Sequence, residues 1–290
     1  MANGPAMNHE SPPSSSSSLP PGGGHLPPPP PPGSLTYGVY LEVEELLKLQ
    51  KPRSNPVEHD EMLFIVIHQT YELWFKELLH EFRAAQRSLE AGDTHRSLSI
   101  LGRIRTILKT CVAQVDILET MTPLQFNSFR SRLGQASGFQ SAQFRELEAI
   151  LGRRDPRAAA HLLPVDRERV AQAMRERSIW DSALRYLASR DVPVPAEVLE
   201  RDPATPYQPN EAVQAALIAA HRSDPEASLV FERLVDIDEG LQEWRYRHVL
   251  MVERTIGHKS GTGGSAGADY LRSTLFTPAF ADLWLIRGDF

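Results

Sequence analysis

Cysteine is almost absent from this sequence of 290 residues, and several kinds of site are excluded with it. The single cysteine, Cys111, cannot form an intramolecular disulfide, a zinc site built on cysteines or a cysteine-ligated iron–sulfur cluster. A chain without disulfides suits a reducing compartment. The N-terminus has no basic segment followed by an apolar run, so it does not resemble a secretory signal. We therefore expect a cytoplasmic protein.

Long apolar runs and a surplus of positive charge are also missing. No apolar stretch approaches the roughly 20 residues that cross a bilayer, and the longest, MLFIVI at 62–67, is predicted to be a piece of core. The 31 Lys and Arg residues against 37 Asp and Glu residues give a formal net charge of −6. Binding to phosphate backbones normally needs a basic surplus gathered on one surface. We expect neither a membrane nor a nucleic-acid partner.

Proline is concentrated at the N-terminus, where eleven of the 23 prolines fall within residues 1–32. The same segment holds a serine run and a glycine run, and Glu10 is its only charged side chain. Such a composition cannot bury apolar surface, so residues 1–34 are predicted to be a disordered tail with local polyproline II structure. The tail is either a solubilising extension or a ligand for a proline-recognising domain. Residues 35–290 are predicted to form a single all-α domain.

Helical periodicity dominates from residue 55 onward, because apolar positions recur at three and four while strand-like alternation is scarce. The first long helix is expected to begin at Pro56 after an Asn55 cap. Its apolar residues surround the helix axis, which predicts a central helix with most of its circumference covered. The pattern predicts a helical bundle with further helices at 94–121, from Thr122 to about Gly134, at 141–151, 166–188, 210–221 and 225–256, and a helical tail to Arg287.

Two of the ten histidines, His68 and His248, lie within strongly apolar helical segments. The residues alone leave several roles open: a hydrogen-bonded core histidine, a catalytic base, a hydrogen-bond partner of a buried ligand, or a metal ligand. An axial ligand of noncovalent heme is the favoured metal role, because a neutral imidazole on a rigid helix is typical there and no CxxCH motif is present. A mononuclear iron site of His68, Glu72 and His248 is the rival.

Arg130 and the glycine-rich loop at 260–267 could both contact an anionic or zwitterionic ligand. Arg130 follows Phe126 and Phe129 on a short helix, so its guanidinium should emerge at a pocket edge and could clamp a carboxylate; a solvated surface position is the alternative. The small residues of the loop would let backbone N–H groups and the Thr262 hydroxyl approach a ligand, unless the loop is only a connector. The loop follows a helix and lacks a GK[ST] ending, which argues against a nucleotide site.

Five long motifs appear in one order along almost all of residues 35–290, and together they resemble the tryptophan 2,3-dioxygenase family. They are LTYGVYL at 35–41, HDEMLFIVIHQTYELWFKELLHE at 59–81, FRSRLGQASGFQS at 129–141, WRYRHVLMVERTIGHKSGTGGSAG at 244–267 and ADLWLIR at 281–287. The resemblance implies an all-α bundle that binds heme b between its helices, usually as a homotetramer. It also implies that both atoms of O2 are added across the C2–C3 bond of L-tryptophan to give N-formylkynurenine.

Residue by residue, the resemblance makes His248 the axial ligand of the heme iron, which is ferrous for activity, and His68 the catalytic histidine that hydrogen-bonds the indole N–H. It implies that Ser137 and Gly138 lie beside the heme. The substrate-binding residues that it implies are Phe64, which packs on the indole, Phe126, Arg130 and Thr262 at the amino-acid end, and Tyr37 and Tyr40 from a neighbouring subunit. Phe126 stands where some family members have a tyrosine that can hydrogen-bond the substrate carboxylate.

Two other functions remain open at the level of sequence. A relative on the same scaffold could insert one oxygen atom into tryptophan or a substituted tryptophan and give an oxindole-type product in a biosynthetic pathway. The same pocket would bind both substrates, so the motifs do not separate the two reactions. A heme-binding sensor or carrier without turnover is the third possibility, although an arginine and a threonine matched to an amino-acid zwitterion would be superfluous in it.

Overall fold

A computed structural model describes residues 30–31, 33–257, 259, 261 and 268–290 of the chain, so almost all of the predicted tail and Thr262 lie outside the described residues. The chain divides between Leu49 and Gln50 into two units. The described part of the first unit contains two helices of one turn each, α1 (Tyr37–Tyr40) and α2 (Val43–Leu46). The second unit, residues 50–290, contains all the long helices and both cavities described below.

The second unit is helical throughout its described residues, which confirms the predicted all-α bundle. Short 3-10 turns connect or end several helices, at Ser131–Leu133, Gly138–Gln140, Pro156–Ala159 and Ile286–Asp289. The helices are α3 (His59–Glu90), α4 (Thr94–Leu118), α5 (Pro123–Arg130), α6 (Ala142–Ile150), α7 (Pro164–Arg175), α8 (Ile179–Ala188), α9 (Ala196–Leu199), α10 (Glu211–Ser223), α11 (Pro225–Ile256), α12 (Ala268–Arg272) and α13 (Ala281–Leu285).

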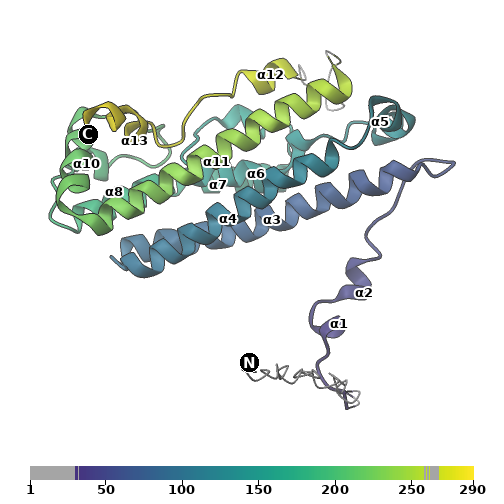
Figure 1. The fold of residues 1–290 in the computed structure, drawn as a ribbon, viewed down its shortest axis with the longest axis horizontal. Helices are drawn as coiled ribbons and strands as arrows, with labels where there is room; N and C mark the ends of the chain where they lie inside the picture. The colour runs from purple at the N-terminus through teal and green to yellow at the C-terminus, as the bar shows by residue number, and fades with distance from the viewer. Residues whose placement is uncertain (1–29, 32, 258, 260, 262–267) are drawn as a thin grey trace, which may run out of the picture. The chain divides into compact units, whose positions relative to one another are not determined.

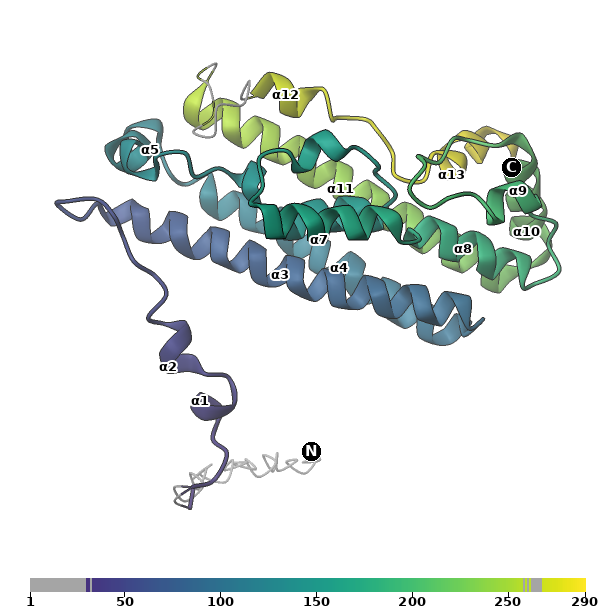
Figure 2. The same cartoon turned by 180° about the vertical axis from the view of Figure 1, so that it is seen from behind.

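Three long helices, α3, α4 and α11, run lengthwise beside one another, and α4 packs extensively on both of the others (Figure 1). α6 and α8 pack on α3, and α7 covers α6 (Figure 2). α10 and α13 pack near the start of α11, whereas α5 contacts α3 and α11 at the opposite end of the bundle. The arrangement brings the N-terminal part of α3 and the C-terminal part of α11 to the same end, although 180 residues separate His68 from His248.

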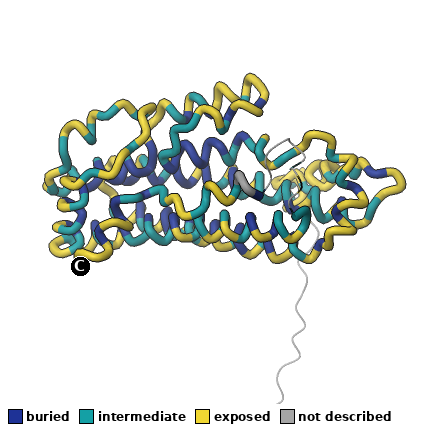
Figure 3. Tube along the Cα trace, turned by 90° about the horizontal axis from the view of Figure 1, so that it is seen from above, coloured by how far each residue is buried: buried dark blue, intermediate teal, exposed yellow. Residues whose placement is uncertain are grey.

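Apolar side chains of α3, α4, α8, α10 and α11 form the main core of the bundle. In Figure 3 the buried segments of the chain lie mostly toward the middle of the bundle, and the exposed segments lie mostly along its edges. The largest fully buried side chains include Phe82, Phe231, Leu101 and Ile104. Because each such side chain removes a large apolar area from water, this core is the main source of stability in the fold.

The first long helix begins later than predicted. Asn55 and Pro56 lie in a bend, and α3 starts at His59 with Glu58 as its cap residue, so the predicted cap at Asn55 is wrong. The cause is Glu61 in the first turn, whose carboxylate accepts hydrogen bonds from the backbone N–H groups of Arg53 (2.7 Å) and Ser54 (2.9 Å) and from the Ser54 hydroxyl. These bonds fold the preceding segment back onto the helix start. The Ser54 hydroxyl in turn accepts from Glu58 N (2.8 Å), a donor that the predicted longer helix would have placed in its first turn.

The helix predicted over 166–188 is two helices. α7 ends at Arg175, Glu176 is extended, and α8 begins at Ile179 after a Ser178 cap. Ser178 and Asp181 form a capping box, in which each side chain satisfies the backbone N–H of the other residue. The last long helix, by contrast, has the predicted bounds: Asp224 caps α11 by accepting from Glu226 N and Ala227 N, and Gly257 follows its end.

The first half of α3 is less covered than predicted. Leu78, Leu79 and Phe82 in the second half are buried, but Val66 and Leu73 in the first half are 40% and 53% exposed. The exposed apolar residues of α3 recur at helical spacing, which places them on one face of the helix. The described residues of this chain therefore do not cover α3 all round.

The chain's last helical segments are attached to α11 by a buried carboxylate. Asp238, which is 0% exposed, accepts hydrogen bonds from Ala279 N (2.9 Å), Phe280 N (3.1 Å) and the Trp284 indole N–H (2.9 Å). The predicted helical tail is interrupted, since only α12, α13 and the turn to Asp289 are helical beyond residue 267. In the described part of the chain, no helix has both the length and the apolar character needed to span a membrane.

Candidate active site

A cavity of about 290 Å³ lies at the end of the bundle where α3, α5 and α11 meet. Its walls are mostly apolar, and Phe75, Val115, Leu118, Met121, Phe144 and Met251 contribute to them. Both candidate histidines line it, His68 from α3 and His248 from α11. So do five other predicted site residues: Phe64, Phe126, Arg130, Ser137 and Gly138. The structure thus brings together seven of the residues singled out in the sequence.

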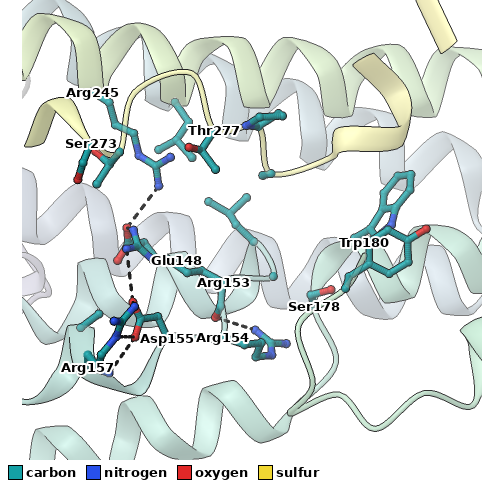
Figure 4. Close-up of a pocket in the computed structure, with 18 of the residues that line it drawn as sticks. Glu148, Arg153, Arg154, Asp155, Arg157, Ser178, Trp180, Arg245, Ser273 and Thr277 are labelled. Atoms are coloured by element: carbon teal, nitrogen blue, oxygen red, sulfur yellow. Dashed lines mark hydrogen bonds and ion pairs between the residues drawn. The ribbon is translucent and has the colours of Figure 1, made fainter. Parts of the chain in front are cut away.

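A larger, more polar cavity of about 840 Å³ adjoins the first (Figure 4). Ser137, Phe139, Glu148, Arg153, Arg245 and Thr274 line both cavities. Neither His68 nor His248 lines the larger one, and among the predicted site residues that the structure describes Ser137 alone does. We place the candidate active site in the smaller cavity, because the two candidate histidines line it. A larger cavity volume does not replace side chains that can bind a cofactor or react with a substrate.

The imidazole of His68 is held in one orientation by its own helix. Its Nδ1 lies 2.7 Å from the carbonyl oxygen of Phe64, one turn earlier in α3. A carbonyl can only accept, so Nδ1 carries the hydrogen and Nε2 is left as an acceptor when the ring is neutral. Burial lowers the pKa of His68, and the Phe64 carbonyl and the charge of Glu72 oppose this shift without cancelling it. The ring therefore offers a neutral acceptor within the cavity.

His248 is a second neutral imidazole on the facing helix. Part of its surface faces the cavity, while burial by the surrounding protein lowers the pKa of the ring to about 4, with a further contribution from His68. The indole of Trp244, one turn earlier in α11, lies parallel to it, with ring centroids 5.3 Å apart and an interplanar angle of 1°. At neutral pH the ring nitrogens are available to a metal instead of a proton.

The triad of His68, Glu72 and His248 is not formed as a metal site. Across the described residues, no group of three or more His, Cys, Asp or Glu side chains is arranged to hold a metal ion. The Glu72 carboxylate instead accepts a hydrogen bond from the Gln143 side-chain amide (2.9 Å), which also donates to the Glu72 carbonyl (2.8 Å). Glu72 thereby ties α3 to α6, and the two-histidine, one-carboxylate interpretation is not supported by this geometry.

Helix α5 closes one side of the cavity and contributes Phe126 and Arg130. Thr122 and Gln125 form the predicted capping box at its start, and Pro123 occupies its first position. Phe126 and Phe129 are buried, and their rings lie 5.8 Å and 5.6 Å from the ring of Phe64. Because these two phenylalanines fix the inner face of a helix of only two turns, its last residue, Arg130, reaches the cavity wall as predicted.

The turn after α5 brings backbone and a hydroxyl to the cavity. Ser137 precedes the 3-10 turn Gly138–Gln140 and accepts a hydrogen bond from Phe139 N (3.4 Å). A Cβ added at Gly138 would meet no heavy atom within 4 Å, so this stretch of cavity wall is open where a side chain would stand. A flat ligand could approach the backbone closely at this position.

Three predicted site residues are not brought to the cavity by the described structure. Thr262 lies outside the described residues, although Gly261, just before it, lines the cavity. Tyr37 and Tyr40 belong to α1 in the first unit, where they are 78% and 71% exposed. Their assignment to a neighbouring subunit's pocket stays a prediction.

Sequence reasoning missed a group of charged residues in the wall that the two cavities share. The Glu148 carboxylate accepts hydrogen bonds from Arg145 (2.5 Å), Arg153 (2.9 Å) and Arg245 (3.3 Å). Arg145 and Glu148 are 6% and 5% exposed. Their position at i, i+3 on the buried face of α6 was the available signal, because charges at core-facing positions are rarely accidental.

These features define an all-helical protein whose apolar cavity is flanked by two neutral histidines and bordered by arginines, as a site for a flat ligand would be. Comparison with known proteins then gives the family: the family model for tryptophan 2,3-dioxygenase matches residues 31–162 and 223–289. The chain belongs to the tryptophan 2,3-dioxygenase family, and the resemblance seen in its motifs is confirmed.

Similar proteins match over nearly their whole length. The tryptophan 2,3-dioxygenase of Anaeromyxobacter dehalogenans strain 2CP-C is 61% identical over 257 residues, which cover 88% of this chain and 96% of that protein. The corresponding protein of Herpetosiphon aurantiacus is 55% identical, with 88% of this chain and 98% of that protein covered. A tryptophan 2,3-dioxygenase of Pseudomonas fluorescens is 40% identical, with 88% and 91% covered.

Proposed function

We propose that this protein is a heme-dependent dioxygenase that adds both atoms of O2 across the indole C2–C3 bond of L-tryptophan and gives N-formylkynurenine. The observation that carries the proposal is the pairing of two neutral histidines from α3 and α11 in one apolar cavity with Arg130 at its wall. The 61% identity to a tryptophan 2,3-dioxygenase supports the same activity. The cytoplasmic location expected from the sequence is part of the proposal.

The residues of the cavity fit heme b. His248 offers a neutral imidazole on a rigid helix of 32 residues, and no three His, Cys, Asp or Glu side chains of the described residues form a compact metal site around it. The open wall at Gly138 and the apolar side chains suit the face of a porphyrin, and the buried arginines of the shared wall suit its carboxylates. Heme bound in the ferrous state through His248 would supply the iron that binds and activates O2.

His68 acts on the substrate instead of on the metal. Its Nδ1 hydrogen is committed to the Phe64 carbonyl, so the free Nε2 can accept one hydrogen bond from the indole N–H. This bond fixes the ring of the substrate over the reacting centre, and the lowered pKa of His68 keeps the imidazole neutral while it does so. In this role His68 orients the indole by a hydrogen bond and does not need to remove a proton.

The remaining side chains position the amino acid and exclude water. Phe64 and Phe126 offer ring faces and edges to the indole. Arg130 can bind the substrate carboxylate through two parallel N–H donors, and Thr262 is proposed to meet the ammonium and carboxylate side. An apolar pocket also strengthens these polar contacts, because little water competes for them.

The test is the mass of the product. Reduced, heme-loaded protein is incubated with L-tryptophan under ¹⁸O₂, and two labelled oxygens in the product are expected. One labelled oxygen would place the chain with the oxindole-forming monooxygenases. Unconsumed L-tryptophan and O2, with heme bound, would overturn the proposal and lead to tests of substituted tryptophans and of a sensor role.

The proposal includes assembly as a homotetramer. Exposed apolar residues occur on four helices at the cavity end of the bundle: Met62, Val66 and Leu73 on α3, Ile117 on α4, Leu124 on α5 and Leu250 on α11. Large apolar side chains exposed to water in this number favour contact with another copy of the chain. Tyr37 and Tyr40 would then close a neighbouring pocket.

Size-exclusion chromatography with light scattering tests the assembly, because it measures the mass of the particle in solution. One subunit has a mass of 32.4 kDa. A mass of four subunits is expected. Leu73→Glu should lower that mass, whereas Val165→Glu, which changes an exposed apolar residue of α7, should leave it unchanged. A wild-type monomer would refute this part of the proposal.

A further inference from the structure

A third and much smaller cavity, of about 20 Å³, lies within the main core beside the candidate active site. We call it the apolar void. By the same measure of volume, one buried water needs about 10–15 Å³, so the void has room for one small molecule. The described residues that line it, and line neither of the other two cavities, come from α3, α4, α6 and α11: Leu78, Phe82, Leu108, Cys111, Leu147 and Ile237.

The wall of the void suits an apolar molecule better than it suits water. Among the described residues that line it, only Glu148, Cys111 and Trp244 carry a polar side-chain group. The Glu148 carboxylate already accepts hydrogen bonds from Arg145 and Arg245, and burial raises the pKa of the Cys111 thiol to about 12, so the thiol is uncharged. A buried water typically makes about three hydrogen bonds, and this wall does not offer them.

Three aromatic side chains separate the void from the candidate active site. Phe75, Phe144 and Trp244 line both the void and the smaller cavity. The ring of Phe144 lies 5.4 Å from that of Phe75 and 5.1 Å from that of Trp244, measured between centroids. The partition is therefore one layer of rings. Core side chains change rotamer even in a packed interior, and a ring that borders a void meets less resistance when it moves.

The two substrates of the proposed reaction differ in what they need from the protein. L-tryptophan is a zwitterion, and its charged end is matched by Arg130 at the cavity wall. O2 is small, uncharged and apolar, so it favours apolar surroundings over water. Heme and L-tryptophan together would fill most of a cavity of about 290 Å³. A separate apolar site behind the cavity wall would then supply the gas without passing the bound amino acid.

We propose that the apolar void is a docking site for O2, from which the gas enters the smaller cavity past the rings of Phe75, Phe144 and Trp244. The inference rests on the proposed function, because that reaction makes O2 the small apolar molecule consumed in the neighbouring cavity. Cys111 offers a way to alter the void alone, since it lines neither of the other cavities.

The first measurement locates an apolar gas in the void. Crystals of the heme-loaded protein are pressurised with krypton, an apolar atom that anomalous scattering distinguishes from water. One krypton atom is expected in the wild-type void. Cys111→Leu adds two heavy atoms to the wall, as many as O2 contains, and should remove the krypton. Cys111→Ala is the matched control: it enlarges the void at the same position and should keep the krypton.

The second measurement is the dependence of turnover on O2 concentration, with L-tryptophan saturating. In Cys111→Leu the KM for O2 should rise about two- to fivefold, because one small apolar site contributes less than a tenfold step in affinity. The KM for L-tryptophan and the kcat at saturating O2 should stay near wild type, and Cys111→Ala should show no rise. Leu147→Phe, which fills the void from α6, is the second variant if Cys111→Leu does not fold.

The outcomes separate this inference from the proposed function. Wild-type protein that turns over L-tryptophan but holds water or no krypton in the void would overturn the inference. The inference would also be overturned if the KM for O2 were the same in wild type, Cys111→Leu and Leu147→Phe, or rose equally in Cys111→Ala. Heme-loaded protein that takes up krypton but consumes neither L-tryptophan nor O2 would instead overturn the proposed function.

Discussion

The two ends of the helical bundle differ in how completely they are packed. At one end, α3, α4, α8, α10 and α11 share a large core whose members are mostly inaccessible to solvent. At the other end there is a small apolar cluster that includes Ile67, Val115, Phe129 and Met251, and Val115 and Met251 line the cavity. The same helices, α3 and α11, run through both ends. The packed end can therefore hold His68 and His248 in place while the cavity end keeps room for ligands.

The largest expected effect is on heme binding, at the cavity end. His248→Ala should abolish stable heme binding because it removes the proposed iron ligand, whereas His68→Ala should keep heme and lose only part of the activity. Absorbance spectra of the two heme-supplemented variants and their turnover of L-tryptophan are the measurements. Equal heme loss in both would indicate ligation by two histidines and an electron-transfer site.

Two phenylalanine variants test whether the two ends of the bundle differ in packing, because each variant changes the free energy of unfolding. Phe231→Ala, in the packed core at 0% exposure, should cost about 3–5 kcal/mol of unfolding free energy, since it leaves a cavity that the core cannot refill. Phe126→Ala, beside the existing cavity, should cost clearly less and weaken substrate binding more. Urea denaturation of the heme-free proteins measures both. Equal losses of stability would contradict the division between the two ends.

Arg130→Leu should weaken L-tryptophan binding roughly 10- to 100-fold, the range for one lost charge-assisted interaction. Stability and heme content should stay near wild type, because Arg130 is at the end of its helix. Arg132→Leu is the control, an exposed arginine in the turn that follows. Substrate titration of the heme-loaded variants gives the affinities, and unchanged affinity in Arg130→Leu would remove the carboxylate assignment.

The smallest effect concerns Glu61 at the start of α3. Burial alone would raise its pKa, but hydrogen bonds from Ser54 and Arg53 outweigh burial and lower the pKa below the usual 4.5. The carboxylate therefore stabilises the fold above about pH 4.5 and loses this contribution as the pH falls through the lowered pKa. Glu61→Gln should cost about 1–2 kcal/mol at pH 7 and less at pH 3. Thermal unfolding at both pH values checks this, and a cost independent of pH would contradict it.

The sequence predicted the bounds of a helix correctly where one capping signal marked them and no other interaction involved the same residues. Asp224 and Pro225 predicted the start of α11 and Gly257 its end, and Thr122 with Gln125 predicted the start of α5. Asn55 and Pro56 gave an equally good signal for a helix start. The Glu61 carboxylate, however, binds the backbone N–H groups of the segment that precedes the helix, and capping rules do not consider such an interaction. The break before α8 had its own signal in the capping residues Ser178 and Asp181. The apolar pattern continues across this break, so the sequence was interpreted as one helix.

The same distinction holds for the candidate site. His68 and His248 were found because a histidine within an apolar helix is conspicuous, and the family motifs joined them to Arg130 and Gly138. The three arginines that share the Glu148 carboxylate were not found, because they come from α6, from the loop after it and from α11. Only the folded arrangement shows that one carboxylate is shared by three arginines.

Asp238 has a consequence for the order in which the protein matures. Gln242 on the same helix donates one hydrogen bond to the Asp238 carboxylate (3.3 Å), but the other three donors lie within residues 279–284, more than 40 positions later in the chain. During synthesis the helix that contains His248 is therefore complete before most partners of its buried carboxylate exist. Burying a carboxylate that lacks most of its hydrogen bonds costs free energy, so we expect the stretch of α11 around Asp238 to pack fully only after residues 279–284 have been synthesised.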